Sequence, residues 1–253
     1  MSGWSDRLLT WACISVLLHT GCAPPLNDGQ AARAFPGADS VAGSDHTPRQ
    51  SDDCLLRLVT EIPFETYGNW FTVMAKAGNQ NVRMLIDTGT STSIELGLAL
   101  MDKADLHILP DWQMILTPYG PIGYKSAILS TFMLGDIEKV NVEAALVADD
   151  DYIPDGINGL IGAAFLRKFD IEIDPANSRI RFYQVQGCRD GLVPFDEPYA
   201  TTDMHMDQFN TPQIPITVND VVLYAHLDTG SAHSFFHEEW RPPRRHVGES
   251  TEV

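Results

Sequence analysis

The sequence is short of positive charge. Its 17 lysines and arginines stand against 34 aspartates and glutamates, so the formal net charge is −17. A protein that binds nucleic acid needs a basic surface to neutralise phosphates, so we expect no nucleic-acid partner. The chain has 253 residues, of which 44% are apolar. That is enough for one large or two small domains with a buried core.

Several catalytic motifs are missing as well. The sequence contains neither a G-x-S-x-G nucleophile motif nor a phosphate-binding P-loop. His226, His233 and His237 lie close together in sequence, and the last two would share one face of a helix, so zinc is the metal to consider. No H-E-x-x-H pattern or nearby cysteine supports a zinc site. We therefore expect no metal and no cofactor.

Cysteine is also scarce, with four in the whole chain. Two of them, Cys13 and Cys22, lie in the first 23 residues, which leaves Cys54 and Cys188 in the rest of the chain. In an oxidising compartment an even pair of this kind predicts a disulfide. Two unpaired thiols are the alternative.

Residues 1–23 have the pattern of an export signal. The apolar run at 8–18 is too short to span a bilayer, and small residues follow it. The end of this segment resembles a bacterial lipobox, which implies lipidation and a membrane tether at Cys22. Free secretion to the periplasm and an uncleaved buried or anchoring helix are the alternatives. Residues 24–53 are rich in Ala, Gly, Pro, Ser and Asp and predict a flexible linker.

Strand patterns dominate from Cys54 onward and predict an all-β protein. Strand-like runs occupy residues 55–62, 70–75, 82–86, 108–117, 127–134, 140–147, 170–174 and 179–183. Short helical turns are predicted within 94–106 and 163–169.

The tripeptide Asp-Thr-Gly occurs twice, each time after an apolar strand and before a hydroxyl residue. The first copy comprises Asp87, Thr88, Gly89 and Thr90, and the second comprises Asp228, Thr229, Gly230 and Ser231. Glycine permits a tight turn, and hydroxyls can hold a carboxylate in place. Two aspartates about 3 Å apart cannot both ionise, so they share a proton and can serve as base and acid. Two ordinary turns after strands are the alternative.

Residues 55–186 resemble one lobe of the bacterial retropepsin-like aspartic peptidases of clan AA. The resemblance rests on residues 85–90, a glycine-bearing hairpin tip at 120–123, the segment 159–162 and the hairpin that ends at Tyr183. It implies an acid-protease-like closed barrel lobe whose segment 160–162 passes behind the catalytic loop.

The resemblance also implies roles for individual residues. Asp87 and Asp228 would be the catalytic dyad, which needs no metal. Thr88 would make the hydroxyl grip between lobes, and Thr90 would bond the outer carboxylate oxygen. The flap over the substrate would contain Gly120, Pro121, Ile122 and Gly123.

The second motif begins a second lobe that we expect to be truncated, because only a short stretch follows Asp228. The expected organisation is signal 1–23, linker 24–53, complete lobe 54–188, connector and start of the second lobe 189–240, and disordered tail 241–253. The predicted function is an aspartic endopeptidase of the bacterial cell envelope that cleaves peptide or protein substrates. A catalytically inactive envelope protein that binds extended peptides is the alternative. A homodimer through the complete lobe, in which Asp87 meets its own copy, also remains open.

Overall fold

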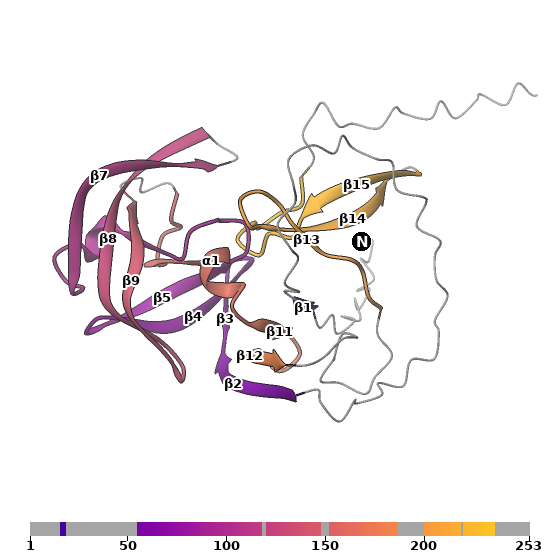
Figure 1. The fold of residues 1–253 in the computed structure, drawn as a ribbon, viewed down its shortest axis with the longest axis horizontal. Coiled ribbons are helices and arrows are strands. Elements are labelled where there is room, and N and C mark those ends of the chain that lie inside the picture. The colour runs from indigo at the N-terminus through magenta and orange to yellow at the C-terminus, as the bar shows by residue number, and fades with distance from the viewer. Residues whose placement is uncertain are drawn as a thin grey trace, which may run out of the picture.

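A computed structural model describes residues 16–18, 55–117, 120–147, 152–186, 200–218 and 220–235 (Figure 1). The expected lipidation site Cys22 and the expected disulfide partners Cys54 and Cys188 lie outside these residues. The same holds for the predicted linker at 24–53 and the predicted tail at 241–253.

The described chain is almost entirely β-structure, which confirms the all-β prediction. Its strands are β1 (Val16–Leu18), β2 (Leu55–Pro63), β3 (Glu65–Tyr67), β4 (Trp70–Ala77), β5 (Gln80–Asp87), β6 (Ile94–Gly97), β7 (Leu106–Thr117), β8 (Gly120–Leu134), β9 (Ile137–Val147), β10 (Gly159–Gly162), β11 (Asp170–Asp174), β12 (Arg179–Gln186), β13 (His205–Met206), β14 (Pro212–Val218) and β15 (Val221–His226). Between them lie a 3-10 turn, η1 (Leu98–Leu100), and one helical turn, α1 (Ala163–Leu166).

The largest sheet closes on itself into a barrel. Its strand order is β3-β4-β5-β10-β6-β9-β8-β7, and an additional pairing between β4 and β8 completes the ring. Closure leaves fewer strand edges open to other chains. A second sheet has the order β1-β11-β12-β2, and its β11–β12 hairpin is the one expected from the alternating pattern.

One core joins the barrel to the second sheet. Phe132 of β8, Phe165 of α1 and Phe182 of β12 are each at most 1% exposed. Phe132 and Phe165 meet edge to face with ring centroids 5.6 Å apart, and Phe169 meets Phe182 in the same way at 5.6 Å. Burial of each aromatic ring contributes about 1.5–3 kcal/mol, so α1 and the turn after it are fixed between the two sheets.

The segment after the first Asp-Thr-Gly differs from its prediction. Residues 94–106 were expected to form a short helix, but the chain first forms β6, which lies between β9 and β10. Ile94, Glu95 and Leu96 are all fully buried there. Pairing on both sides outweighs the local helical preference, and only the single turn η1 follows.

A third sheet carries the second Asp-Thr-Gly motif. Its order is β13-β14-β15, and in Figure 1 it lies on the other side of α1 from the β7–β8 hairpin. β15 ends two residues before Asp228.

β1, which falls within the segment expected to be an export signal, pairs with β11. Among the described residues, none of the helical segments has the length and apolar character needed to cross a bilayer.

Candidate active site

The two Asp-Thr-Gly loops, far apart in sequence, face each other. Asp87 is the last residue of β5, and Asp228 follows β15. A Cβ atom added at Gly89 would lie less than 3.0 Å from the carboxyl of Asp228. A Cβ atom added at Gly230 would lie equally close to the carboxyl of Asp87. Each carboxyl therefore rests against the glycine of the opposite loop, where a side chain would displace it.

A reciprocal pair of hydrogen bonds joins the loops. The backbone N–H of Thr88 donates to Oγ1 of Thr229 at 3.1 Å, and the N–H of Thr229 donates to Oγ1 of Thr88 at 3.1 Å. Each hydroxyl then donates onward to the opposite loop. Oγ1 of Thr229 donates to the carbonyl of Ile86 at 2.7 Å, and Oγ1 of Thr88 donates to the carbonyl of Leu227. Two loops tied in this way move as one unit.

Backbone donors orient both carboxyl groups. The N–H of Gly89 donates to Oδ1 of Asp87 at 2.8 Å, and the N–H of Gly230 donates to Oδ1 of Asp228 at 2.8 Å. The N–H of Thr90 adds a longer bond of 3.2 Å to Oδ1 of Asp87. The glycine N–H of each loop therefore orients its aspartate in the same way, and Asp87 has one additional backbone donor.

The hydroxyls that follow the two motifs act differently from what the resemblance implied. Oγ1 of Thr90 donates to Oε1 of Glu95 at 2.5 Å, and it is the backbone N–H of Thr90 that reaches Asp87. Oγ of Ser231 donates to the carbonyl of His233 at 2.7 Å. The difference arises because Oε1 of Glu95 lies within hydrogen-bond distance of the Thr90 and Thr92 hydroxyls and accepts from both.

Electrostatics favour one shared proton in this site. Asp87 is 8% exposed. Burial, the nearby charge of Asp228 and the charge of Glu95 together raise the pKa of Asp87 to about 8, against the opposing effect of the Gly89 N–H. A carboxyl with this pKa stays protonated at neutral pH and can donate a proton.

The β10 strand supports the first loop from behind. It pairs in parallel with β5, so that Gly162 lies opposite Asp87, and it pairs antiparallel with β6. The N–H of Ala163 donates to the carbonyl of Thr90 at 2.8 Å. The segment 160–162 thus passes behind the first Asp-Thr-Gly loop, where the sequence resemblance put it.

The four residues assigned to the flap begin β8. β7 and β8 form a long hairpin in which Thr117 pairs with Gly120 and Met114 pairs with Gly123. Ile122 packs on a small apolar cluster of Leu85, Val147, Ile153, Ile157 and Leu160. Pro121 and Gly123 are exposed. Since Leu85 and Leu160 belong to the strands that carry and support Asp87, the end of this hairpin next to its tip packs against the strands of the site.

Two residues of the site were missed at the level of sequence. The indole N–H of Trp70, at the start of β4, donates to the carbonyl of Gly230 at 2.8 Å, which fixes the second loop to the first lobe. Glu95 accepts the Thr90 hydroxyl below the first loop. Trp70 gave no signal, because its partner is a backbone carbonyl 160 residues away. For Glu95 the signal was a charged residue between two apolar ones, but the segment was read as helix.

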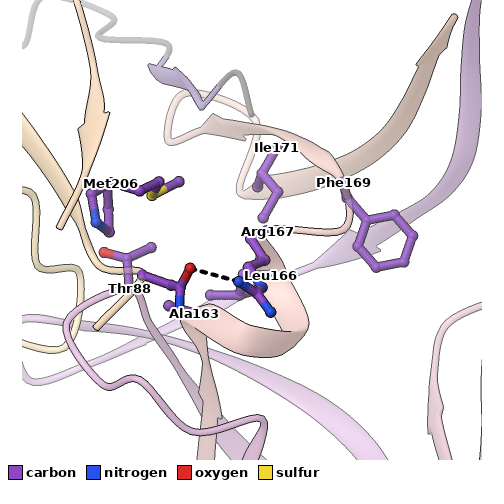
Figure 2. A pocket seen from close by; sticks show the side chains of 9 residues that line it. Thr88, Ala163, Leu166, Arg167, Phe169, Ile171 and Met206 are labelled. Carbon is purple, nitrogen blue, oxygen red and sulfur yellow. Dashed lines mark hydrogen bonds between the residues drawn. The ribbon is translucent and has the colours of Figure 1, made fainter. Parts of the chain in front are cut away.

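A small apolar cavity lies next to Thr88, and neither aspartate lines it (Figure 2). It is lined by Thr88, Ala163, Leu166, Arg167, Phe169, Ile171, Met206, Asn210 and Pro212. Arg167 crosses it to bond Oδ1 of Asn210 at 2.7 Å. The cavity therefore marks the junction of the first lobe with the third sheet.

No group of three or more His, Cys, Asp or Glu side chains is arranged to hold a metal ion in the described part of the chain. Of the three histidines considered for zinc, His226 bonds Thr211 and Gln213 through its two ring nitrogens, each at 3.1 Å. His233 is bonded through its carbonyl by Ser231, and His237 lies outside the described residues.

The first lobe is similar to known proteins. Residues 73–165 match the model of a family described as aspartyl protease. One similar solved structure is a retropepsin-like aspartic protease from Rickettsia conorii, with 18% identity and a TM-score of 0.37. That match covers 53% of this chain and 94% of the other. Comparison with curated proteins gives no match.

Proposed function

We propose that this chain, which carries a retropepsin-like aspartic peptidase lobe, is an endopeptidase whose dyad is formed by Asp87 and Asp228. One observation carries the proposal: the glycine of each Asp-Thr-Gly loop contacts the carboxyl of the other loop, with a reciprocal threonine grip beneath them. Such a pair of aspartates needs no metal or covalent intermediate to hydrolyse a peptide bond. An extended segment of a polypeptide is the substrate that fits between the dyad and the β7–β8 hairpin.

The mechanism follows from one proton shared by two carboxyls. A water molecule bound between them loses a proton to the ionised aspartate as its oxygen attacks the peptide carbonyl carbon. The protonated aspartate donates to the carbonyl oxygen, which forms a tetrahedral diol. The proton taken from water then passes to the leaving nitrogen, and a hydroxyl of the diol returns its proton to the aspartate that had donated one. The C–N bond breaks as the diol collapses to the new carboxyl group, and the two aspartates are back in the one-proton state. Asp87 holds the proton in the resting enzyme, because burial and the neighbouring carboxyls raise its pKa.

The test of this function is hydrolysis of an unfolded, fluorescently labelled protein in H₂¹⁸O. The account expects new carboxyl termini with one ¹⁸O atom, because water attacks directly. It also expects that hydroxylamine traps no acyl-enzyme. Wild-type protein that cleaves nothing between about pH 3 and 8, a range around ordinary and raised carboxyl pKa values, would overturn the proposal and leave peptide binding without turnover.

We place this activity in the bacterial cell envelope, tethered through Cys22. The support is the signal-like pattern of residues 1–23 and the linker-like composition of 24–53. Cys22→Ser is expected to move the protein from the membrane fraction to the soluble fraction. Wild-type protein already found in the soluble fraction, with cleavage after Ala23, would contradict the tether.

A further inference from the structure

Glu95 is a buried carboxyl that the mechanism above does not use. Its side chain is 0% exposed in the middle of β6. In the barrel it is paired with Leu160 of β10 and Ala145 of β9. A carboxyl at such a position costs free energy unless its oxygens are satisfied. Departures of this kind from core patterning are concentrated at functional sites.

One oxygen of Glu95 is bonded to the loop that carries Asp87. Oε1 accepts the Thr90 hydroxyl at 2.5 Å and the Thr92 hydroxyl at 2.6 Å. The N–H of Thr90 in turn donates to Oδ1 of Asp87. Glu95 therefore fixes the residue whose backbone orients the catalytic carboxyl.

We propose that Glu95 is a positioning residue of this site: it holds Thr90 and thereby sets the orientation and the proton affinity of Asp87. The inference rests on the proposed function and deepens it. Glu95 contacts neither the water nor the peptide, since the Thr90 loop lies between it and the dyad.

The surroundings of Glu95 favour its neutral form. Its Oε2 is buried without a hydrogen-bond partner among the described residues, and its Oε1 receives only neutral hydroxyls. The titratable groups that interact with it are Asp87, Tyr152 in the β9–β10 loop and Tyr124 of β8. Hydrogen bonding from the Tyr152 hydroxyl lowers the pKa of Glu95.

Burial raises the pKa of Glu95 more than the Thr90, Thr92 and Tyr152 hydroxyls lower it. The charge of Glu95 is in turn one of the causes that raise the pKa of Asp87, after burial and the charge of Asp228. The protonation of Glu95 and the titration of Asp87 are therefore linked.

The variants Glu95→Leu and Glu95→Gln separate positioning from packing. Leucine fills a similar volume without a buried polar group, so Glu95→Leu should fold with unchanged or higher thermal stability at neutral pH. It should nevertheless lose about tenfold in kcat, the effect of one lost hydrogen bond to the Thr90 loop, with KM little changed. Glutamine retains an uncharged acceptor and should restore most of kcat.

Glu172 supplies the matched control. It is also a buried glutamate, 6% exposed, but it lies on β11 and bonds Arg181 and Tyr183. Glu172→Leu should lower thermal stability and leave kcat per folded molecule unchanged. Glu95→Leu with kcat equal to that of Glu172→Leu would overturn the inference. The inference would also be overturned if Glu95→Gln lost as much kcat as Glu95→Leu. Activity would then require a charge at position 95 and not a neutral acceptor.

A second readout does not depend on activity. The ¹³C resonance of the Asp87 carboxyl, followed by NMR from pH 3 to about 10, a range that brackets its raised pKa, reports its titration directly. The midpoint should move in Glu95→Leu and stay near that of wild type in Glu172→Leu. An Asp87 midpoint unaffected by Glu95→Leu overturns the positioning role even if the protein cleaves nothing. A moved midpoint in an inactive protein upholds it and contradicts only the proposed function.

Discussion

Thr88 and Thr229 each donate a backbone N–H to the hydroxyl of the other, with both bonds at 3.1 Å. Because both donors and both acceptors sit between the loops, neither threonine can lose its hydroxyl without leaving a polar group of the other unpaired. This exchange ties together the two loops that carry Asp87 and Asp228. It also accounts for the identity of the residue after each aspartate.

Replacing Thr229 by valine tests the reciprocal hydrogen bonds between Thr88 and Thr229. Valine has a similar shape but leaves the Thr88 N–H without its acceptor, so the free energy of unfolding should fall by about 1–3 kcal/mol. Peptidase activity should fall with it, while Thr229→Ser should retain both. Thr60→Val is the control. The Thr60 hydroxyl accepts a hydrogen bond of 3.1 Å from the N–H of Asp136, and this pair lies outside the site. Equal loss of activity in both variants would show a general loss of stability instead.

A methyl group at position 230 should displace the opposite aspartate. The added Cβ would lie less than 3.0 Å from the carboxyl of Asp87. Misplacement of a reacting group by about 1 Å costs about 100-fold in rate, so Gly230→Ala should lose at least that in kcat/KM. Gly97→Ala is the matched variant, because its Cβ would meet nothing closer than 3.7 Å. An active Gly230→Ala enzyme would mean that Asp87 does not face this loop.

Trp70→Phe should weaken the attachment of the second Asp-Thr-Gly loop to the first lobe while keeping an aromatic ring at position 70. The substitution removes the N–H that donates to the carbonyl of Gly230 and should cost about 0.5–1.5 kcal/mol of stability. We expect a fall in kcat of about fivefold, the rate equivalent of about 1 kcal/mol. Tyr183→Phe removes a hydrogen bond to Glu172 far from the dyad, and it should reduce stability but not kcat.

The raised pKa of Asp87 gives the stability a definite pH dependence. Between the ordinary aspartate value of 3.8 and the folded value of about 8, the folded protein holds a proton that the unfolded chain has released. Stability should therefore fall as pH rises through this window. Asp87→Asn removes the titration and should be more stable than wild type at pH 8 by on the order of a few kcal/mol. Denaturant unfolding at pH 4 and pH 8 measures the difference, and equal stability of the two proteins at pH 8 would contradict it.

Most of the strands and the two aspartate loops could be predicted from sequence because their signals are local. Each Asp-Thr-Gly follows an apolar strand, and a repeated motif of this kind is visible in the residues themselves. The β11–β12 hairpin was equally clear, since Asp170–Asp174 and Arg179–Gln186 alternate around a turn. Local pattern was sufficient wherever a strand pairs with its neighbour in sequence.

Long-range contacts could not be predicted in the same way. β6 is a strand because β9 and β10 enclose it, and its own residues are compatible with a helix. The position of Glu95 under the catalytic loop follows from that pairing, so the wrong secondary structure concealed the residue. The Trp70 bond to Gly230 likewise joins a side chain to a backbone atom in another sheet, which composition and spacing do not reveal.

The comparison of Asp87→Asn with Asp228→Asn tests the central claim most directly, with cleavage of an unfolded protein measured at pH 5. Because the facing loops belong to one chain, each variant should lose about 10²- to 10⁴-fold in kcat/KM, the range for removal of a general acid or base. Both should remain folded by circular dichroism. Full activity of Asp228→Asn with none in Asp87→Asn would contradict the account, because Asp87 would then pair with its own copy in a homodimer.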